Sequence, residues 1–586
     1  MKKPNRWKSK LTAFIIACTM TVPAGQASAY FSGIDKQDGG IGNTTHYLDQ
    51  VPNIALDPKV DNIIYPLMAT PAIKKNGSEL TVKVDTKGKE PAGWDISLNP
   101  TEAAKVDGSF QLPVKSVKKG SSYWKESSSI YEITVSIPDD VPEELFDLQV
   151  SYTGDGSRIT DDEPNSVKII KEYKKDFTFI HLTDIHVGSP RNIADPKNAT
   201  EAGMWDPDLN KRWLYLQKTI KQVNLLKPDF VVLTGDLMFG QMNPQEYIYE
   251  YEETYRILKQ FNVPVYLVPG NHDYYAQDAT LADGAKYWEQ YFGPQYFSFD
   301  YGPYAHMIGY NSFDWDKFDR QGHGTVSVPT WGGQVRDQQM DWIKKDLADN
   351  GAVSSPEQIK GLFSHHNPIW RDRDIWPASD PNVVDYWKEY DAKHNPQNLS
   401  TLLKGEKLGN DYDQQWHGEG AHELIDVMKQ NGVDISLHGH THIDNITEQD
   451  GILYSTTSSI ELTGKPWVGY RLFEKDPANK KFNSYIYEGP DKSMPVYENG
   501  NTAAGVVSFE NNFKLPNDGS QVSQTATVTN RLNKPVTISI PFYMKQGIYT
   551  PSKGEVIETQ LYGTKQFVEV KTTIPANSTQ AIDLNR

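Results

Sequence analysis

The pattern of apolar and polar positions divides the chain into three regions. From about residue 64 to 172, short runs with alternating apolar positions, such as ELTVKVDT and IYEITVSIP, are separated by Gly, Pro, Asp and Ser, which is typical of strands in a small β-sandwich. From 176 to about 490, apolar strands alternate with amphipathic helical stretches such as DQQMDWIKKDLADN, and this pattern predicts a layered α/β core. After about residue 500 the alternating runs return, for example in FVEVKTTIP, and predict a second β-module.

The first 29 residues follow none of these patterns. Five basic and no acidic residues precede or border an apolar stretch from Leu11 to Val22, which is followed by Ala27-Ser28-Ala29. This order is typical of a secretory signal peptide cleaved after Ala29, and the stretch is too short for a permanent bilayer anchor. The alternative is a lipoprotein signal at Cys18. We therefore expect a secreted protein, extracellular or cell-wall associated, without a transmembrane segment.

These patterns together predict an α/β (α+β) chain of four segments. They are a signal peptide (1–29), an N-terminal arm with an Ig- or fibronectin-like β-sandwich (30–172), a central α/β domain (173–495) and a C-terminal β-sandwich module (500–586). Cys18 is the only cysteine, so the mature chain would have no disulfide to stabilise it. Losing the five basic residues of the signal moves the formal net charge from -17 to -22, which disfavours general binding to nucleic acid. Nothing in the sequence indicates the oligomeric state.

Five apolar strand candidates in the central region each run into a cluster of polar residues. The segments are FTFIHLTDIH, DFVVLTGD, VPVYLVPGNHD, IKGLFSHHNP and VDISLHGHTH. Their polar residues are Asp184, His186, Asp236, Asn271, His272, Asp273, His365, His366, His438, His440 and His442. Because ligands in α/β proteins bind beyond the carboxyl ends of strands, all five clusters are expected to meet at one edge. Carboxylates and imidazoles aimed at one point indicate a metal site.

Each cluster taken alone has a simpler explanation. Asp and His end strands by bonding to local backbone, and Gly-Asp and Gly-Asn are ordinary turn sequences. On a strand, alternation would send Asp184 and His186 to the same side. It would likewise place His438, His440 and His442 on one face of an extended segment, where three protonated imidazoles would repel unless a metal or other partners hold them neutral. Five such coincidences at one edge favour the metal site.

Asp-x-His, Gly-Asp, Gly-Asn-His-Asp, a histidine and Gly-His-x-His follow one another here in the order found in calcineurin-like metallophosphoesterases. The chain resembles that superfamily over its central domain, about half of the mature chain. The resemblance implies a four-layer αββα sandwich with two metal ions at the strand ends. It also implies hydrolysis of phosphomonoesters or phosphodiesters by a hydroxide that bridges the two metals.

Carried over to this sequence, the resemblance implies two ligand sets that share Asp236. One set is Asp184, His186, Asp236 and His442; the other is Asp236, Asn271, His440 and one of His365 or His366. The choice within the pair stays open: His366-Asn367-Pro368 fits the His-x-Pro spacing of the family and slightly favours His366, whereas the strand ends nearer His365. Imidazole, carboxylate and amide ligands suit Mn, Fe or Zn better than Ca.

The predicted catalytic residues are Asp236 and His272. On a tight turn beside the ligand Asn271, His272 is predicted to point toward the substrate and to protonate or stabilise the leaving alkoxide, with Asp273 or another carboxylate keeping it charged. Phe239 stands where purple acid phosphatases, a related group, carry a ligand tyrosine. The phenolate that colours those enzymes is therefore not expected.

Two other functions compete with phosphoester hydrolysis. The first is a non-catalytic cell-surface binding protein, in which the β-modules bind the partner and the metal-bound core is catalytically inactive. Such a core would have no chemical reason to keep every metal ligand. A zinc hydrolase of the metallo-β-lactamase type needs His-x-His-x-Asp-His, and here Asp444-Asn445 follows Ile443 instead. The Trp- and Tyr-rich segment 367–420 is expected either to wall the substrate pocket or to pack as a surface subdomain. Nothing in it separates monoesters from diesters.

Overall fold

The computed structural model describes most of the chain after the N-terminal arm. The described residues are 56–187 without 103, 214–239, 244–274, 284–315, 332–369 without 352–354, 416, 420–460, 467–485, 494–498, and 511–586 without 518, 531–534 and 563. The predicted signal peptide and most of segment 367–420 lie outside these residues. Among the residues described, no helix combines the length and apolar character needed to cross a membrane.

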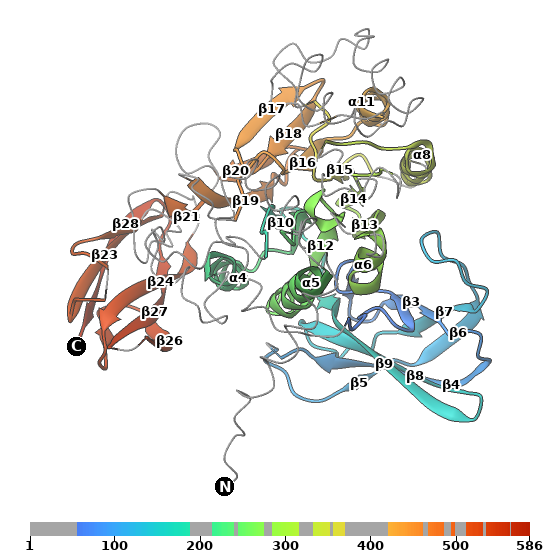
Figure 1. Cartoon of the computed structure of the whole chain (residues 1–586), viewed down its shortest axis with the longest axis horizontal. Helices are drawn as coiled ribbons and strands as arrows, with labels where there is room; N and C mark the ends of the chain where they lie inside the picture. Colours follow the sequence, from blue (N-terminus) through green and yellow to red (C-terminus); the bar gives the residue numbers. More distant parts are fainter. Residues whose placement is uncertain are drawn as a thin grey trace, which may run out of the picture.

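The N-terminal β-module consists of two sheets that pack around a shared apolar core (Figure 1). The sheet orders are β1-β3-β7-β6 and β2-β9-β8-β4-β5. The strands are β1 (Ile63–Tyr65), β2 (Ala72–Lys75), β3 (Glu79–Asp85), β4 (Pro91–Pro100), β5 (Phe110–Gln111), β6 (Val114–Lys119), β7 (Ile130–Ser136), β8 (Leu145–Gly154) and β9 (Ser157–Ile170). Alternation sets the inner face: Leu80, Val82 and Val84 of β3 are fully buried, and the residues between them are not.

The central region contains two further sheets. The first has the order β12-β11-β10-β19-β20, with β21 paired to β19, and the second β13-β14-β15-β16-β18-β17. The strands are β10 (Thr178–Leu182), β11 (Phe230–Thr234), β12 (Val265–Val268), β13 (Phe297–Tyr301), β14 (Ala305–Gly309), β15 (Ile359–Phe363), β16 (Ile435–His438), β17 (Asn445–Gln449), β18 (Ile452–Thr456), β19 (Trp467–Lys475), β20 (Phe482–Tyr485) and β21 (Met494–Glu498). β10 to β12 run parallel, as do β14, β15, β16 and β18, so their carboxyl ends share an edge in each sheet.

The two central sheets pack face to face, with helices outside. Phe179 of the first sheet and Phe363 of the second belong to one buried cluster of aromatic and aliphatic side chains. Helices α4 (Leu214–Leu226), α5 (Pro244–Leu258) and α6 (Gly284–Tyr291) lie beside the first sheet, and α8 (Asp337–Gly351) and α11 (Ala421–Gln430) beside the second (Figure 1). This is the four-layer αββα arrangement, so the predicted fold is confirmed.

The C-terminal β-module again has two sheets, ordered β22-β23-β28-β25 and β24-β27-β26. The strands are β22 (Asn511–Phe513), β23 (Ser523–Asn530), β24 (Val536–Lys545), β25 (Thr550–Pro551), β26 (Glu555–Tyr562), β27 (Lys565–Ile574) and β28 (Ser578–Asn585). Lys221 of α4 forms ion pairs with Glu558 and Glu569 of this module.

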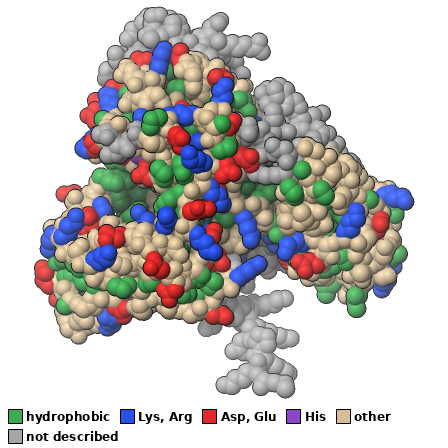
Figure 2. Space-filling view, turned by 180° about the vertical axis from the view of Figure 1, so that it is seen from behind, with side chains coloured by type: hydrophobic (Ala, Val, Ile, Leu, Met, Phe, Trp, Pro, Cys, Tyr) green, Lys and Arg blue, Asp and Glu red, His purple; other side chains and the backbone are tan. Residues whose placement is uncertain are grey.

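On the face drawn in Figure 2, acidic and basic side chains are interspersed. The domain boundaries taken from the sequence stay predictions.

Candidate metal centre

The predicted site residues follow strands of both central sheets. In the first sheet, β10 is followed by Asp184 and His186, β11 by Asp236, and β12 by Asn271 and His272. In the second sheet, β15 is followed by His365 and His366, and β16 by His440 and His442. Because the sheets are stacked with these carboxyl ends together, residues nearly 260 positions apart meet at one edge.

Asp236 lies at the centre of this convergence and is almost fully buried. Its Oδ2 atom is 3.1 Å from His186 Nε2, a residue of the first sheet. The same oxygen is 3.1 Å from His365 Nε2, a residue of the second sheet. Its Oδ1 atom accepts the backbone N–H of His272 at 3.0 Å. One carboxylate oxygen therefore faces both halves of the cluster.

Asp184 presents its two oxygens differently. Oδ2 accepts the hydroxyl of Thr183 at 2.6 Å and the backbone N–H of His440 at 3.0 Å. Oδ1 is 3.1 Å from His442 Nε2. Local hydrogen bonds thus orient the carboxylate so that Oδ1 points at the imidazole with which it is predicted to share a metal.

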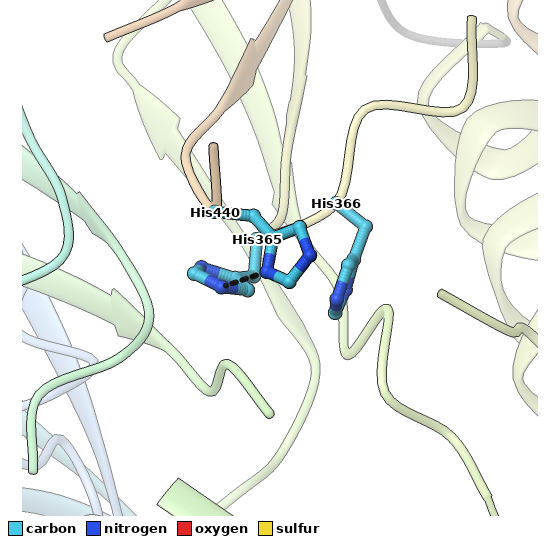
Figure 3. Close-up of side chains that lie close together, drawn as sticks. All are labelled: His365, His366 and His440. Atoms are coloured by element: carbon cyan, nitrogen blue, oxygen red, sulfur yellow. Dashed lines mark hydrogen bonds between the residues drawn. The ribbon is translucent and has the colours of Figure 1, made fainter. Parts of the chain in front are cut away.

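The paired histidines meet His440 on the second-sheet side (Figure 3). His365 Nδ1 donates to the carbonyl of Thr234 at 2.7 Å, which leaves Nε2 facing Asp236 and 3.2 Å from His440 Nδ1. His366 Nδ1 is bonded to Ser312 Oγ at 2.9 Å. Hydrogen bonds of this kind fix the tautomer and ring orientation of metal-binding histidines. Both members of the pair lie in the cluster, so the choice between them stays open.

His438 does not join the other two histidines of the HGHTH segment. Its Nε2 is bonded to Ser436 Oγ at 2.8 Å and its Nδ1 lies 3.3 Å from Ser364 Oγ. Strand β16 ends at His438, and φ is 72° at His440 and 58° at His442. The prediction that all three share one face of an extended segment is therefore wrong, because the backbone turns immediately after the strand.

Left-handed backbone is a common property of the site. Five of the eight predicted ligand positions have positive φ: Asp184 (51°), His186 (40°), Asp236 (54°), His440 (72°) and His442 (58°). Asp184 and His186 therefore converge through a turn, and the expected strand alternation is not the cause. Non-glycine residues adopt this conformation at a cost of about 1–3 kcal/mol each, and such strain concentrates at functional sites.

Two glycines allow the strand-end loops to approach each other. A Cβ atom at Gly270 would lie 2.1 Å from Asp236 Oδ1, and one at Gly439 would lie 1.8 Å from Thr183 Oγ1 and 2.5 Å from Asp184 Oδ2. Any larger residue would push a proposed ligand aside. These positions serve the site by having no side chain.

His272 opens the short 3-10 turn η2 (His272–Tyr274). Its Nδ1 donates to the backbone carbonyl of Phe239 at 2.5 Å, and its Nε2 lies 4.0 Å from Asp236 Oδ2. The ring also packs against Phe239, with centroids 5.2 Å apart. The nitrogen that is not bound to the carbonyl is thus held beside the cluster.

Asp273 has a structural role that the sequence did not reveal. Its carboxylate accepts the backbone N–H groups of Asp236, Leu237, Met238 and Gly270. Burial and the neighbouring Asp236 raise the pKa of Asp273 to about 7. Asp273 is not placed to keep His272 protonated, because backbone amides engage its oxygens; the other carboxylate that the prediction allowed for is represented by Asp236, 4.0 Å from His272 Nε2. Asp273 holds the loops after β11 and β12 together instead.

The electrostatics of the cluster favour a bound cation. Burial alone would raise the pKa of the Asp184 and Asp236 carboxyls, but the facing histidines hold both below their usual range. Burial opposes protonation of His365, yet Asp236 and Asp184 raise its pKa to about 9. Without metal, the His365 ring is therefore protonated at neutral pH and faces the two carboxylates. A metal ion binding here would take the place of that proton and release it.

The donor set fits divalent or trivalent metals. Among the described residues, four groups of three His or Asp side chains bring their ligand atoms within 4.8 Å of one another, and all belong to this cluster. The groups are His365–His366–His440, Asp184–His186–His442, His186–Asp236–His272 and Asp184–Asp236–His365. Mixed imidazole and carboxylate donors suit Zn, Mn or Fe.

Comparison with known families agrees with this geometry. The family model for calcineurin-like phosphoesterases matches residues 177–444, a range that contains every predicted ligand. Residues 177–444 form a calcineurin-like phosphoesterase domain. The matched range spans strands β10 to β16, after which the predicted ligands lie, and it supports phosphoester hydrolysis as the reaction class.

Individual relatives are distant. Over 95 residues the chain is 30% identical to the DNA double-strand break repair protein Mre11 of Methanococcus maripaludis, a match covering 16% of this chain and 23% of that protein. The chain thus spans about a quarter of the curated relative it matches. A predicted phosphoesterase from Streptococcus pneumoniae TIGR4 overlaps 54% of this chain and 96% of its own, at 14% identity and a TM-score of 0.20. A cold-active protein tyrosine phosphatase overlaps 60% and 94%, also at 14% and 0.20. Neither overlap contributes to the assignment.

The residues that orient the ligands were missed by the sequence analysis. Thr183, Thr234 and Ser312 are all fully buried, and each bonds to the side chain of a predicted ligand. The sequence contains a signal for the two threonines. Thr183 stands directly before Asp184 in LTD, and Thr234 stands two residues before Asp236 in LTGD, each at the end of an apolar strand. Ser312 lies 54 residues from His366, and no local pattern connects the two.

Five residues of the Trp- and Tyr-rich segment are described: 367–369, 416 and 420. Trp416 is buried and bridges to Gly333, where a Cβ would lie 2.6 Å from its ring and 3.0 Å from His366 Cβ. Trp416 therefore lies near the second-sheet histidines. The remaining part, with Arg371 and Arg373, lies outside the described residues, and its role as pocket wall stays a prediction.

Proposed function

We propose that the protein is a secreted phosphoric ester hydrolase that works with two metal ions. The observation that carries this proposal is the position of Asp236 Oδ2, which lies 3.1 Å from an imidazole nitrogen of each sheet. The match to calcineurin-like phosphoesterases supports the reaction class. Secretion is supported by the composition of the first 29 residues.

The first metal would be held by Asp184, His186, Asp236 and His442, and the second by Asp236, Asn271, His440 and one of the paired histidines. The contacts of Asp236 and Asp184 support the division. The orientation of His365 Nε2 toward Asp236, 3.1 Å away, supports His365 as the ligand over His366, which the sequence spacing slightly favours. Metal contents of His365→Ala and His366→Ala test this choice, and a loss confined to His366→Ala would reverse it.

Two bound cations would activate a water molecule and neutralise charge on the phosphoryl oxygens. The chain supplies the remaining functions. Asp236 joins the two halves of the cluster, and the buried carboxylates compensate the metal charge. His272, fixed by the Phe239 carbonyl, is placed to hold a proton at Nε2 for the leaving group, an effect of about 10²- to 10⁴-fold in rate.

The test is hydrolysis of p-nitrophenyl phosphate and bis-p-nitrophenyl phosphate by protein loaded with Mn²⁺, Fe²⁺ or Zn²⁺. Turnover of the first, the second or both would assign a phosphomonoesterase, a phosphodiesterase or a dual enzyme. Absence of turnover in metal-loaded protein would overturn the proposal.

A variant isolates the role of His272. His272→Ala should keep its metals and lose rate mainly with poor alcohol leaving groups, because p-nitrophenolate departs with little help. Rates for an alkyl and a nitrophenyl ester of the same phosphate provide the comparison. Unchanged rates for both would remove His272 from catalysis.

A further inference from the structure

A fully buried arginine lies on the strand beside the proposed centre. Arg471 belongs to β19 and is paired in register with His181 of β10, and both residues are 0% exposed. A buried guanidinium is costly unless a carboxylate compensates its charge. Here Arg471 Nη2 lies 3.0 Å from Asp444 Oδ1. Because β19 is in the first sheet and Asp444 follows a turn of the second, this ion pair ties the two sheets together.

Asp444 is the second residue after the proposed ligand His442. Its Oδ1 also accepts the backbone N–H of Ser458 at 3.0 Å, so it fixes the end of the turn that begins after β16. The turn carries left-handed φ at His440 and His442. A strained turn of this kind persists only when its surroundings hold it, and the Arg471–Asp444 pair is such a restraint.

A second chain of hydrogen bonds leads from Arg471 to His365. Arg471 Nε lies 3.5 Å from Thr457 Oγ1, which is bonded to His181 Nδ1 at 2.9 Å. His181 Nε2 is bonded to Thr234 Oγ1 at 2.8 Å, and the carbonyl of Thr234 accepts from His365 Nδ1. Burial and the nearby guanidinium lower the pKa of His181 to about 3, so its neutral ring links the two hydroxyls.

We propose that Arg471 is a positioning residue of the metal centre: anchored on β19, it holds Asp444 and Thr457 and thereby sets how the second-sheet histidines face Asp184 and Asp236. The inference rests on the proposed two-metal function. It adds to that function a residue that touches neither metal nor substrate. It also explains why an arginine is buried at this point, because the branched guanidinium group can reach the Asp444 carboxylate and the Thr457 hydroxyl at the same time.

The experiment is titration of metal-free full-length protein with Co²⁺, followed by the visible absorption that reports ligand geometry. Arg471→Met and Asp444→Asn should each weaken Co²⁺ binding about 10- to 100-fold, as is typical for residues that orient ligands, and should alter the spectrum. The double variant should bind no more weakly than the worse single variant, because both changes break one contact. Arg471→Lys keeps the charge without the fork and should restore binding only in part.

Lys475→Met is the matched control, because it removes another buried cation from β19 at the end of the strand away from the site. It should leave the Co²⁺ affinity and spectrum unchanged. If Arg471→Met does not fold, Asp444→Asn and Arg471→Lys carry the test. Wild-type affinity and spectrum in these variants would overturn the positioning role alone. Failure of the wild-type protein to bind Co²⁺ would overturn the two-metal function and the inference together.

Discussion

A single methyl group at Gly270 should damage the proposed centre. The Cβ of Gly270→Ala would lie 2.1 Å from Asp236 Oδ1, 2.6 Å from Asp236 N and 2.9 Å from Asp236 Cγ. Ordinary contact begins near 3.4 Å, so the carboxylate or the loop must move by more than 1 Å. The φ of Gly270 is not in the left-handed region, so alanine is allowed there and the penalty is steric.

The expected cost follows from that displacement. Overpacking of a filled interior costs about 1–3 kcal/mol, and misplacing a reacting group by about 1 Å costs on the order of 10² in rate. Gly270→Ala should therefore bind less metal and lose about 100-fold in kcat/KM for the better nitrophenyl ester. Gly351→Ala is the control, because its Cβ would meet no described atom within 4 Å. Activity within twofold of wild type and full metal content in Gly270→Ala would refute the reasoning.

Three further predictions follow from the same contacts. Asp236→Asn should lower occupancy of both metals, whereas Asn271→Ala should lower mainly the second; elemental analysis measures both, and full occupancy in Asp236→Asn would remove the shared-ligand role. His306 lies 2.8 Å from both Asp300 and Asp346, which raise its pKa to about 9 although burial opposes this. Its folded pKa exceeds the unfolded value of about 6.5, so about 3 kcal/mol of stability should be present below pH 6.5 and lost as pH rises through 9. His306→Gln should remove that dependence from melting curves recorded in chelator, and parallel wild-type and variant curves would contradict it. Removing the metals should itself lower the melting temperature, because a ligand that binds only the folded state stabilises it; an unchanged curve after verified removal would count against a structural metal.

Local patterns predicted the positions of the site residues but not their geometry. A strand ending in Asp184 or Asp236 is visible in the sequence because apolar runs stop there. The left-handed turns that aim these side chains are not visible, because they depend on how closely loops from two sheets approach at Gly270 and Gly439. His438 was misplaced for that reason, since alternation was extended past the end of β16.

Long-range contacts set the remaining features. Arg471 and Asp444 are 27 residues apart and belong to different sheets, so no periodicity links them. Asp273 looked like a partner for His272 because the two are adjacent in sequence. In the structure, the Asp273 carboxylate accepts hydrogen bonds from four backbone amides instead. The family resemblance implied the order of the predicted ligands, whereas the residues that orient them became visible only in the structure.

The most direct test of the two-metal centre is stepwise reconstitution. Metal-free protein would be titrated with Mn²⁺ while bound metal and turnover of the nitrophenyl esters are measured in the same samples. Because Asp236 is proposed to serve both ions, turnover should stay low up to one equivalent and reach its maximum at two. Full turnover at one equivalent, or two bound equivalents without turnover, would contradict the account.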